Sequence, residues 1–454
     1  PLLALLFTAS FLFAQNHNIT LRSTLTFPGQ TLANVWGIKK NGKEFALVGA
    51  SQGLVIVDVT DPENPSIVTQ LTDGINSLWR EVKTFGNYAY VVSEGTSGGQ
   101  GGVGIANLSN LPSTPVTFHK YKGDGAIANQ LHRAHALHVD TIKGYAYIFG
   151  TTGLANGGAV ALNLNSDPYN PTYAGMYNGS YIHDGYAHND TLWGGHIYGG
   201  YFSCINFANK PSPVVLATQT TPNAFTHNTW LSADGNYLFT TDEKSNSYLA
   251  AYNIENLSNI VETDRIQTTP GSGSIVHNTH VKTHYAISSW YKDGVTVVDV
   301  NRPRNLIQVG NYDTYTVGSG NGFDGAWGVY PFLPSGNLLV TNIEENLGGG
   351  SEGGVLYILT PTYEAACYLE GNVRDASTNQ NLNGVSVQIQ YSDPLNSSTS
   401  GLNGNYATGQ PTSGTFDVVF SKTNYVTQTI SATLTHGEVT TLNVLLMPQS
   451  ALPL

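Results

Sequence analysis

The chain has 454 residues, enough for two or three domains, and 40% of them are hydrophobic, which is ample for packed cores. Asp and Glu outnumber Lys and Arg by 31 to 19, so the formal charge is −12 and nucleic acid and anionic membranes are not expected partners. The 50 glycines and a charged fraction of only 11% favour a protein of many short strands and tight turns.

The first residues, PLLALLFTASFLFAQ, form one apolar run that ends in small residues, which is typical of a secretory signal and its cleavage region. Neither Met nor a basic residue precedes the run, so we expect residues 1–14 to be the remnant of a signal that is cleaved after Ala14. No other segment is apolar for long enough to cross a bilayer. The sequence therefore predicts a secreted or cell-surface protein without a membrane span after cleavage.

A pattern of four strands repeats along residues 15–364. Its first complete copy, VWGIKKNGKEFALVGASQGLVIVDVTDPENPSIVTQL, alternates apolar strands with turns of the Asn-Gly and Asp-Pro kind. When the copies are aligned on their turns, one position of each first strand falls in register, at Trp36, Trp79, His135, His183, His227, His277 and Trp327. Successive register positions lie 43 to 56 residues apart. Four strands in such a repeat predict an all-β, seven-bladed β-propeller.

The seventh copy ends after its third strand, GVLYILT, and thus lacks a fourth. The segment NITLRSTLTF, Asn18 to Phe27, reads as a strand with no hairpin partner nearby. We expect this strand to complete the seventh blade, which would close the ring without a free edge.

Several of these segments resemble known blade motifs. LVIVDVTDPENP resembles the LVIVD repeat, and HNTWLSADGNYLFTTDE, HNTHVKTHYAISSWYKDGVTVVDV and GAWGVYPFLPSGNLLVTN are similar to blades of the secreted bacterial choice-of-anchor B proteins. The resemblance covers roughly Asn34 to Thr360. It implies an exported propeller whose C-terminal attachment varies, and it implies no particular reaction.

From Tyr368 the pattern changes to short alternating strands, as in LEGNVRDASTNQNLNGVSVQI, with a closing LNVLL. Residues 365–454 resemble the carboxypeptidase regulatory-like β-sandwich, which implies an accessory or spacer module, with carbohydrate or protein binding as the alternative. Cys204 and Cys367 are the only cysteines and fall in different domains, so we expect them to remain unpaired.

Four register positions are histidines, and hairpin pairing predicts acidic residues beside this end of the blades. Counting outward from each turn gives three expected neighbours, namely His227 with Asp242, Trp79 with Glu94, and Trp327 with Glu344. The candidate ligands of a divalent metal, zinc or calcium, are His135, His183, His227, His277, Asp242 and Glu243. The candidate contacts of a larger ligand at the channel mouth are Trp36, Trp79, Glu94, Trp327 and Glu344.

Three interpretations of this end of the channel stay open. The repeated side chains can tie neighbouring blades together through hydrogen bonds, hold a metal or polar ligand, or act as acid and base in catalysis. The change from Trp to His around the ring makes it asymmetric, as a functional mouth would be. Two Gly-rich stretches that carry Glu, residues 94–104 and 342–354, are further candidates for calcium.

The sequence carries no HExxH motif and no cysteine nucleophile with an obvious partner, so an enzyme is not the first interpretation. We expect an exported binding protein whose partner is an extracellular glycan or protein, since Trp and Tyr at a channel mouth suit either. The alternative is a metal-dependent hydrolase or lyase that uses the histidines and carboxylates.

Overall fold

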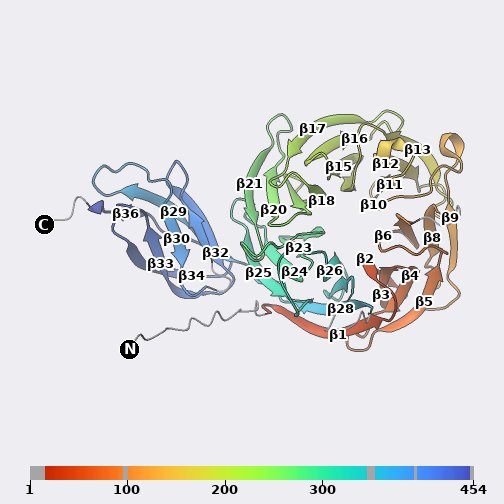
Figure 1. Cartoon of the computed structure of the whole chain (residues 1–454), viewed down its shortest axis with the longest axis horizontal. Helices are drawn as coiled ribbons and strands as arrows, with labels where there is room; N and C mark the ends of the chain where they lie inside the picture. The colour runs from red at the N-terminus through yellow and green to blue at the C-terminus, as the bar shows by residue number, and fades with distance from the viewer. Residues whose placement is uncertain (1–15, 96–100, 345–352, 393–395, 450–454) are drawn as a thin grey trace, which may run out of the picture.

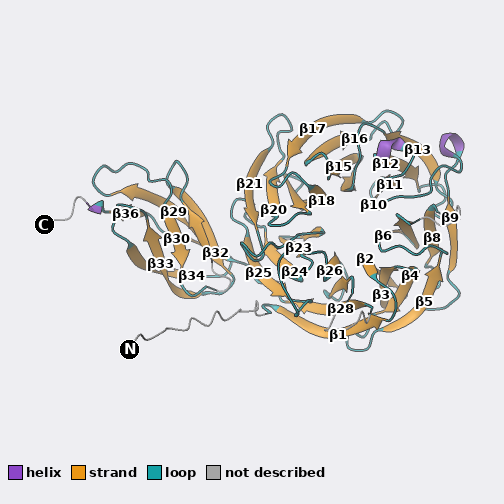
Figure 2. Cartoon of the chain, in the orientation of Figure 1, coloured by secondary structure: helices purple, strands orange, loops and turns teal. Residues whose placement is uncertain are grey.

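The computed structural model describes residues 16–95, 101–344, 353–392 and 396–449, and nearly all regular structure in these ranges is β-strand (Figure 2). Two 3-10 helices, η1 (Gly125–Ile127) and η2 (Ala155–Gly157), are the short exceptions. Neither of them could cross a bilayer. No helix in the described ranges is both long and apolar enough to do so. The predicted signal segment, residues 1–14, lies outside the described part of the chain.

Seven four-stranded antiparallel sheets surround a central axis, as predicted (Figure 1). The first strand of each blade lies against the first strands of both neighbouring blades, so these seven strands line the axis. The first three blades consist of β2 (Leu32–Lys40), β3 (Lys43–Ala50), β4 (Gly53–Asp58) and β5 (Ser66–Thr72); β6 (Arg80–Phe85), β7 (Tyr88–Ser93), β8 (Val103–Asn107) and β9 (Thr117–Tyr121); and β10 (Ala136–Asp140), β11 (Tyr145–Phe149), β12 (Ala159–Asn163) and β13 (Thr172–Tyr177).

The remaining blades consist of β14 (Asp184–His188), β15 (Thr191–His196), β16 (Tyr201–Asn206) and β17 (Val214–Thr220); β18 (Thr226–Leu231), β19 (Tyr237–Asp242), β20 (Leu249–Asn253) and β21 (Val261–Ile266); β22 (Thr279–Lys282), β23 (Tyr285–Ser289), β24 (Val295–Asp299) and β25 (Ile307–Tyr312); and β26 (Ala326–Tyr330), β27 (Leu338–Asn342), β28 (Gly354–Pro361) and β1 (Ile19–Phe27).

The N-terminal strand β1 closes the ring. It pairs antiparallel with β28, the third strand of the seventh blade, along nearly its whole length (Figure 1). Phe27 is buried in the apolar cluster that also holds Val48 and Leu356. Ile19 is buried in the cluster that holds Val297. The strand thus joins the seventh blade to both of its neighbours, and the prediction made from its missing partner is confirmed.

The propeller core lies between the blades. One cluster, for example, packs Tyr90 and Ile105 of the second blade against Leu137, Ile148 and Val160 of the third. Burying each such side chain contributes about 1.5–3 kcal/mol. Because every blade shares its apolar faces with two neighbours, the positions of the first strands are set by packing all round the ring.

The C-terminal part forms a separate β-sandwich of two sheets with its own apolar core. Its strands are β29 (Cys367–Asp375), β30 (Ser386–Ile389), β31 (Ser397–Thr399), β32 (Asn405–Gln410), β33 (Gly414–Ser421), β34 (Gln428–Leu434), β35 (Val439–Thr441) and β36 (Val444–Leu446). The two cysteines are buried and free, in agreement with the sequence.

Polar contacts fix the sandwich against the sixth blade. Arg302 Nη2 lies 2.7 Å from Glu370 Oε2, and Arg302 Nε donates to Glu370 Oε1 at 2.8 Å. The buried Asn305 Nδ2 donates to the carbonyl of Thr408 at 3.0 Å. The sandwich therefore lies beside the outer part of the propeller and leaves the channel uncovered (Figure 1).

Replacing Phe27 by Ala tests the closing strand. The cavity left between the first and seventh blades should lower the free energy of unfolding by about 3–5 kcal/mol. The measurement is urea denaturation followed by tryptophan fluorescence. Thr26→Ala, on the exposed face of the same strand, should change stability by less than about 0.5 kcal/mol. Equal effects of the two substitutions would contradict the closure by β1.

Candidate functional site

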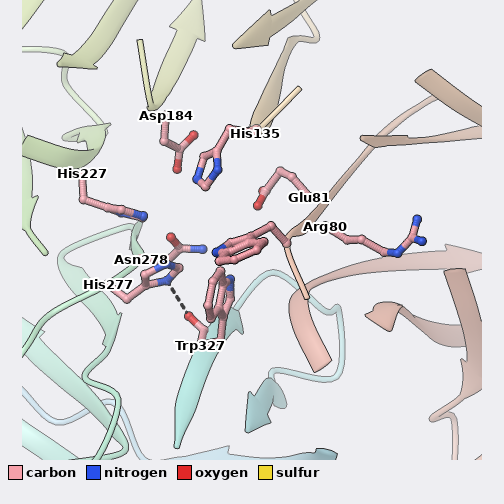
Figure 3. A pocket seen from close by; sticks show the side chains of 10 residues that line it. Arg80, Glu81, His135, Asp184, His227, His277, Asn278 and Trp327 are labelled. Atoms are coloured by element: carbon pink, nitrogen blue, oxygen red, sulfur yellow. Dashed lines mark hydrogen bonds between the residues drawn. The ribbon is translucent and has the colours of Figure 1, made fainter. Parts of the chain in front are cut away.

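The inner strands of blades three to six bring four histidines to one end of the channel. The backbone N–H groups of His135, His183 and His277 donate to the second strand of their own blades, at 3.0, 2.8 and 2.9 Å. His227 lies within β18, where a bulge separates the paired residues Thr226 and Asn228. Figure 3 shows His135, His227 and His277 directed into one pocket.

The four imidazole rings form a continuous series, the histidine cluster. The ring centroids are 3.7 Å apart for His135 and His183, 4.8 Å for His183 and His227, and 4.1 Å for His227 and His277. Two groups of side chains have ligand atoms within 4.8 Å of one another, namely His135, His183 and His227, and His227, His277 and Glu243. His227 belongs to both groups.

The histidines differ in their hydrogen bonds. His135 Nδ1 lies 2.7 Å from Glu94 Oε1, and His277 Nδ1 donates to the carbonyl of Trp327 at 2.8 Å. Both hydrogen bonds reach a neighbouring blade, so these two rings tie blades together, as the structural interpretation predicts. His227 is only 2% exposed, and its Nδ1 has no hydrogen-bond partner. His183 Nδ1 lies 3.3 Å from the Tyr181 hydroxyl within its own blade. The structural interpretation therefore accounts for His135 and His277 as ties between blades, but not for the unpartnered nitrogen of His227.

Burial determines the charge of the cluster. It lowers the pKa of His183 and of His227 well below 6.5, and the neighbouring histidines add to this effect. It also lowers the pKa of His277 to about 3. These three rings are therefore neutral at physiological pH, and each keeps a nitrogen electron pair.

Two carboxylates adjoin the cluster. Burial raises the pKa of Glu243 to about 6, although Tyr291 Oη donates a hydrogen bond to its Oε1. The same oxygen lies 3.9 Å from His277 Nε2. Burial alone would also raise the pKa of Glu94, but the hydrogen bond with His135 lowers it below the usual range. Of the predicted acidic neighbours, these two lie with the histidines.

A small pocket opens beside the cluster, with about 270 Å³ of empty space including its mouth. Trp79 and Trp327 form part of its wall, and Figure 3 shows Trp327 there. The pairing of Trp79 with Glu94 is confirmed, because the Glu94 N–H donates to the Trp79 carbonyl at 3.3 Å. The buried Asn278 also lines the pocket, and its Oδ1 has no hydrogen-bond partner.

The sequence analysis missed Glu81, Asp184 and Asn278 in this pocket. Each follows a register residue by one or two positions in the same segment. A bulge breaks the alternation of a strand, so two successive residues can face the axis, as they do around His227. Glu81 accepts a hydrogen bond from Lys83, whose pKa burial lowers to about 8. The signal for these residues was their place one position after a register residue, for Asp184 and Asn278, or two positions after it, for Glu81.

Asp242 does not lie with the histidines, so this predicted ligand is wrong. The bulge shifts the pairing by one residue, and Asp242 pairs with Thr226 in place of His227. Its carboxylate accepts hydrogen bonds from Thr221 Oγ1 at 2.6 Å and from the Asn223 N–H at 2.7 Å. Asp242 thus holds the loop that leads into β18.

A similar bulge in β26 changes the pairing that was expected for Trp327 and Glu344. Ala326 pairs with Asn342, where β27 ends, so Trp327 falls beside the end of that strand. Glu344 belongs to neither group of ligand atoms. The following Glu345 lies outside the described residues, as do large parts of both Gly-rich stretches proposed for calcium, at 96–100 and 345–352.

Trp36 lies at the other end of the channel, which corrects its predicted place at the mouth. Its Nε1 donates to Thr84 Oγ1 at 3.1 Å, and its ring centroid is 4.7 Å from that of Tyr330. Trp36 is closer to its hairpin turn than the histidines are to theirs, so it lies further along the inner strand. Ala33 takes the register place, packed with Trp327.

Aromatic side chains fill the end of the channel where Trp36 lies. The Trp230 ring contacts those of Tyr186, His280, His138 and Phe332, with centroid distances of 4.5, 4.6, 5.6 and 5.8 Å. The pocket described above lies at the opposite, histidine end of the channel.

These features define a seven-bladed β-propeller followed by a β-sandwich. Residues 35–73 match the LVIVD repeat, and residues 368–447 match the carboxypeptidase regulatory-like domain. Both resemblances proposed from the sequence are thereby confirmed for these two segments.

Among solved structures, the chain is similar to one described as YCF48 bound to D1 peptide, with 10% identity and a TM-score of 0.51 over 75% of this chain and 95% of that one. It also aligns with a putative 6-phosphogluconolactonase from Bacteroides uniformis, with 13% identity and a TM-score of 0.44 over 59% of this chain and 81% of that one. No curated protein matches the chain. The first similarity supports the propeller fold and says nothing about the ligand.

A buried ion pair fixes the start of β6, directly after Trp79. The Arg80 guanidinium contacts Asp73 at 2.7 and 2.9 Å, and Lys120 Nζ lies 2.8 Å from the same carboxylate. Burial alone would raise the pKa of Asp73, but Arg80 and Lys120 together lower it below 3.8. The carboxylate therefore stabilises the fold at any pH above its unfolded pKa.

Asp73→Asn should lower the free energy of unfolding at pH 7 by about 3–5 kcal/mol, because it leaves a buried guanidinium without its charge partner. The stabilising contribution of Asp73 is lost as the pH falls through its lowered folded pKa. The difference between the wild type and Asp73→Asn should therefore shrink below about pH 4. Urea denaturation at pH 7 and pH 3 measures it. A constant difference would refute the argument, and Asp417→Asn on the exposed sandwich surface should change little.

Proposed function

We propose that this chain is an exported binding protein that takes up an extracellular glycan at the histidine end of the propeller channel. The observation that carries this proposal is a set of exposed aromatic side chains around that end. Trp79 is 44% exposed, Tyr198 78% and Phe323 57%. Exposed aromatic rings present a flat apolar face with little rotamer freedom, which suits stacking on a sugar ring.

Each of the three rings is linked to the histidine cluster. Trp79 lines the pocket with His135 and His227. Tyr198 packs 5.2 Å from Tyr181, whose hydroxyl lies 3.3 Å from His183 Nδ1. Phe323 packs 5.2 Å from Tyr291, whose own ring is 5.2 Å from that of His277. The aromatic rim and the polar pocket therefore belong to one region of the surface.

The distribution of these rings favours a glycan over a polypeptide. They come from separate segments of the chain around the mouth, with polar groups such as the partly exposed Glu94 between them. Carboxylate oxygens accept hydrogen bonds from sugar hydroxyls. A protein interface would favour a contiguous, largely apolar core patch instead. Export is proposed from the apolar run at residues 1–14 and from the likeness to choice-of-anchor B propellers.

The second candidate function is a metal-dependent hydrolase or lyase. The observation that favours it is the contact of two carboxylates, Glu94 and Glu243, with His135 and His277. Imidazole and carboxylate groups at such distances are those that acid–base chemistry uses. This function requires a cation at the cluster and a substrate within reach of it.

A glycan array probed with the full chain tests the proposal. Trp79→Ala and Tyr198→Ala should each weaken binding to the glycans that the wild type binds on the array. The expected loss of affinity is about tenfold, which corresponds to about 1.4 kcal/mol of lost stacking. Tyr391→Ala removes an aromatic side chain that is 93% exposed on the sandwich, and it should bind as the wild type does.

Loss of binding in Tyr391→Ala, or unchanged binding in both rim variants, would refute the proposed location. If the array shows no bound glycan while a peptide library binds in a manner that depends on Trp79, the partner is a polypeptide. Cleavage of an array glycan would instead favour the enzyme.

A further inference from the structure

A buried nitrogen without a partner lies at the centre of the histidine cluster. His227 is almost fully buried, and its Nδ1 makes no hydrogen bond. Leaving a buried polar atom unpaired costs about 1–3 kcal/mol. The adjacent Asn278 Oδ1, on the wall of the same pocket, is also buried without a partner. Two such atoms at one pocket indicate that the site is built for a group that supplies their partners.

The neighbouring rings have the outer contacts of metal ligands. Metal-bound histidines usually donate their second ring N–H to a carboxylate or a backbone carbonyl, which fixes the ring and its tautomer. His135 makes this contact with Glu94 at 2.7 Å, and His277 makes it with the Trp327 carbonyl at 2.8 Å. The other nitrogen of each ring then keeps its electron pair for a ligand at the cluster.

His277 Nε2 and Glu243 Oε1 lie close together but too far apart for a hydrogen bond. In the tautomer in which His277 Nδ1 donates to the Trp327 carbonyl, the electron pair of the ring lies on Nε2. That atom lies 3.9 Å from Glu243 Oε1, which already accepts a hydrogen bond from Tyr291. Two electron-pair donors thus lie close together, and a cation beside them would satisfy both.

We propose that the histidine cluster binds one divalent transition-metal ion of the zinc class, with His227 as the ligand common to both groups of donor atoms. Imidazole nitrogens and a single carboxylate suit Zn²⁺. Ca²⁺ requires six to eight oxygen ligands, so the donor set does not suit the calcium alternative at this position. The inference does not depend on the glycan proposal, because it rests on the cluster and not on the aromatic rim.

The test uses the purified full chain after treatment with a chelator. Zn²⁺ is titrated in competition with a chromophoric chelator, and the bound metal is counted by plasma mass spectrometry. The wild type should bind close to one Zn²⁺ per chain. His227→Ala should weaken this binding by about 100-fold or more, and Glu94→Gln, which removes a positioning contact of His135, by about 10- to 100-fold.

His280→Ala is the matched control. It also removes a buried histidine whose Nδ1 has no partner, but at the aromatic end of the channel. It should bind Zn²⁺ as the wild type does. Circular dichroism checks that each variant is folded, and if His227→Ala does not fold, Glu94→Gln decides the question.

Absence of near-stoichiometric Zn²⁺ binding by the wild type would overturn the proposal. The same conclusion would follow if folded His227→Ala, or Glu94→Gln in its place, bound Zn²⁺ as tightly as the wild type. An equal loss in His280→Ala would also overturn it. A zinc result in either direction leaves the glycan array result unaffected, so the two proposals fail separately.

Discussion

The meeting of seven strands at one axis is the constraint on which the rest of this structure depends. Apolar packing between blades holds the first strands close together, so their inward side chains share a narrow space. A polar group placed there loses water and must find a partner within the ring. Asn228 Nδ2 therefore donates to Asp184 Oδ2 at 2.6 Å, and Lys83 pairs with Glu81. At one end aromatic rings fill the space, and at the other end histidines do.

The histidine end combines rings that tie blades together with buried polar atoms that have no hydrogen-bond partner. His135 and His277 serve as ties between blades, and His227, one of the two rings between them, has a ring nitrogen without a hydrogen-bond partner. The two ties orient their rings, and packing between the blades holds the cluster in place.

The features that could be predicted from the sequence are those that depend on local pattern. Turn residues and alternation established seven blades, and the missing strand identified β1 as the closing one. The register of the four histidines followed from the same alignment. Asp242 was misplaced because the bulge at His227 arises only in the folded pairing. Trp36 was misplaced because it lies nearer to its turn than the histidines lie to theirs, which puts it further along the inner strand. Asp184 and Asn278 were missed because each directly follows a register residue, and strict alternation would turn its side chain away from the axis.

The pairing of β1 with β28 joins segments more than 300 residues apart in the sequence, and it has a consequence for synthesis. While the chain emerges from the ribosome, Ile19–Phe27 has no partner until Gly354–Pro361 has been made. During most of translation the nascent propeller therefore keeps an open side, and its inner strands cannot reach their final spacing. The ring therefore closes, and the histidines of the cluster reach their final spacing, only after the third strand of the seventh blade has been made.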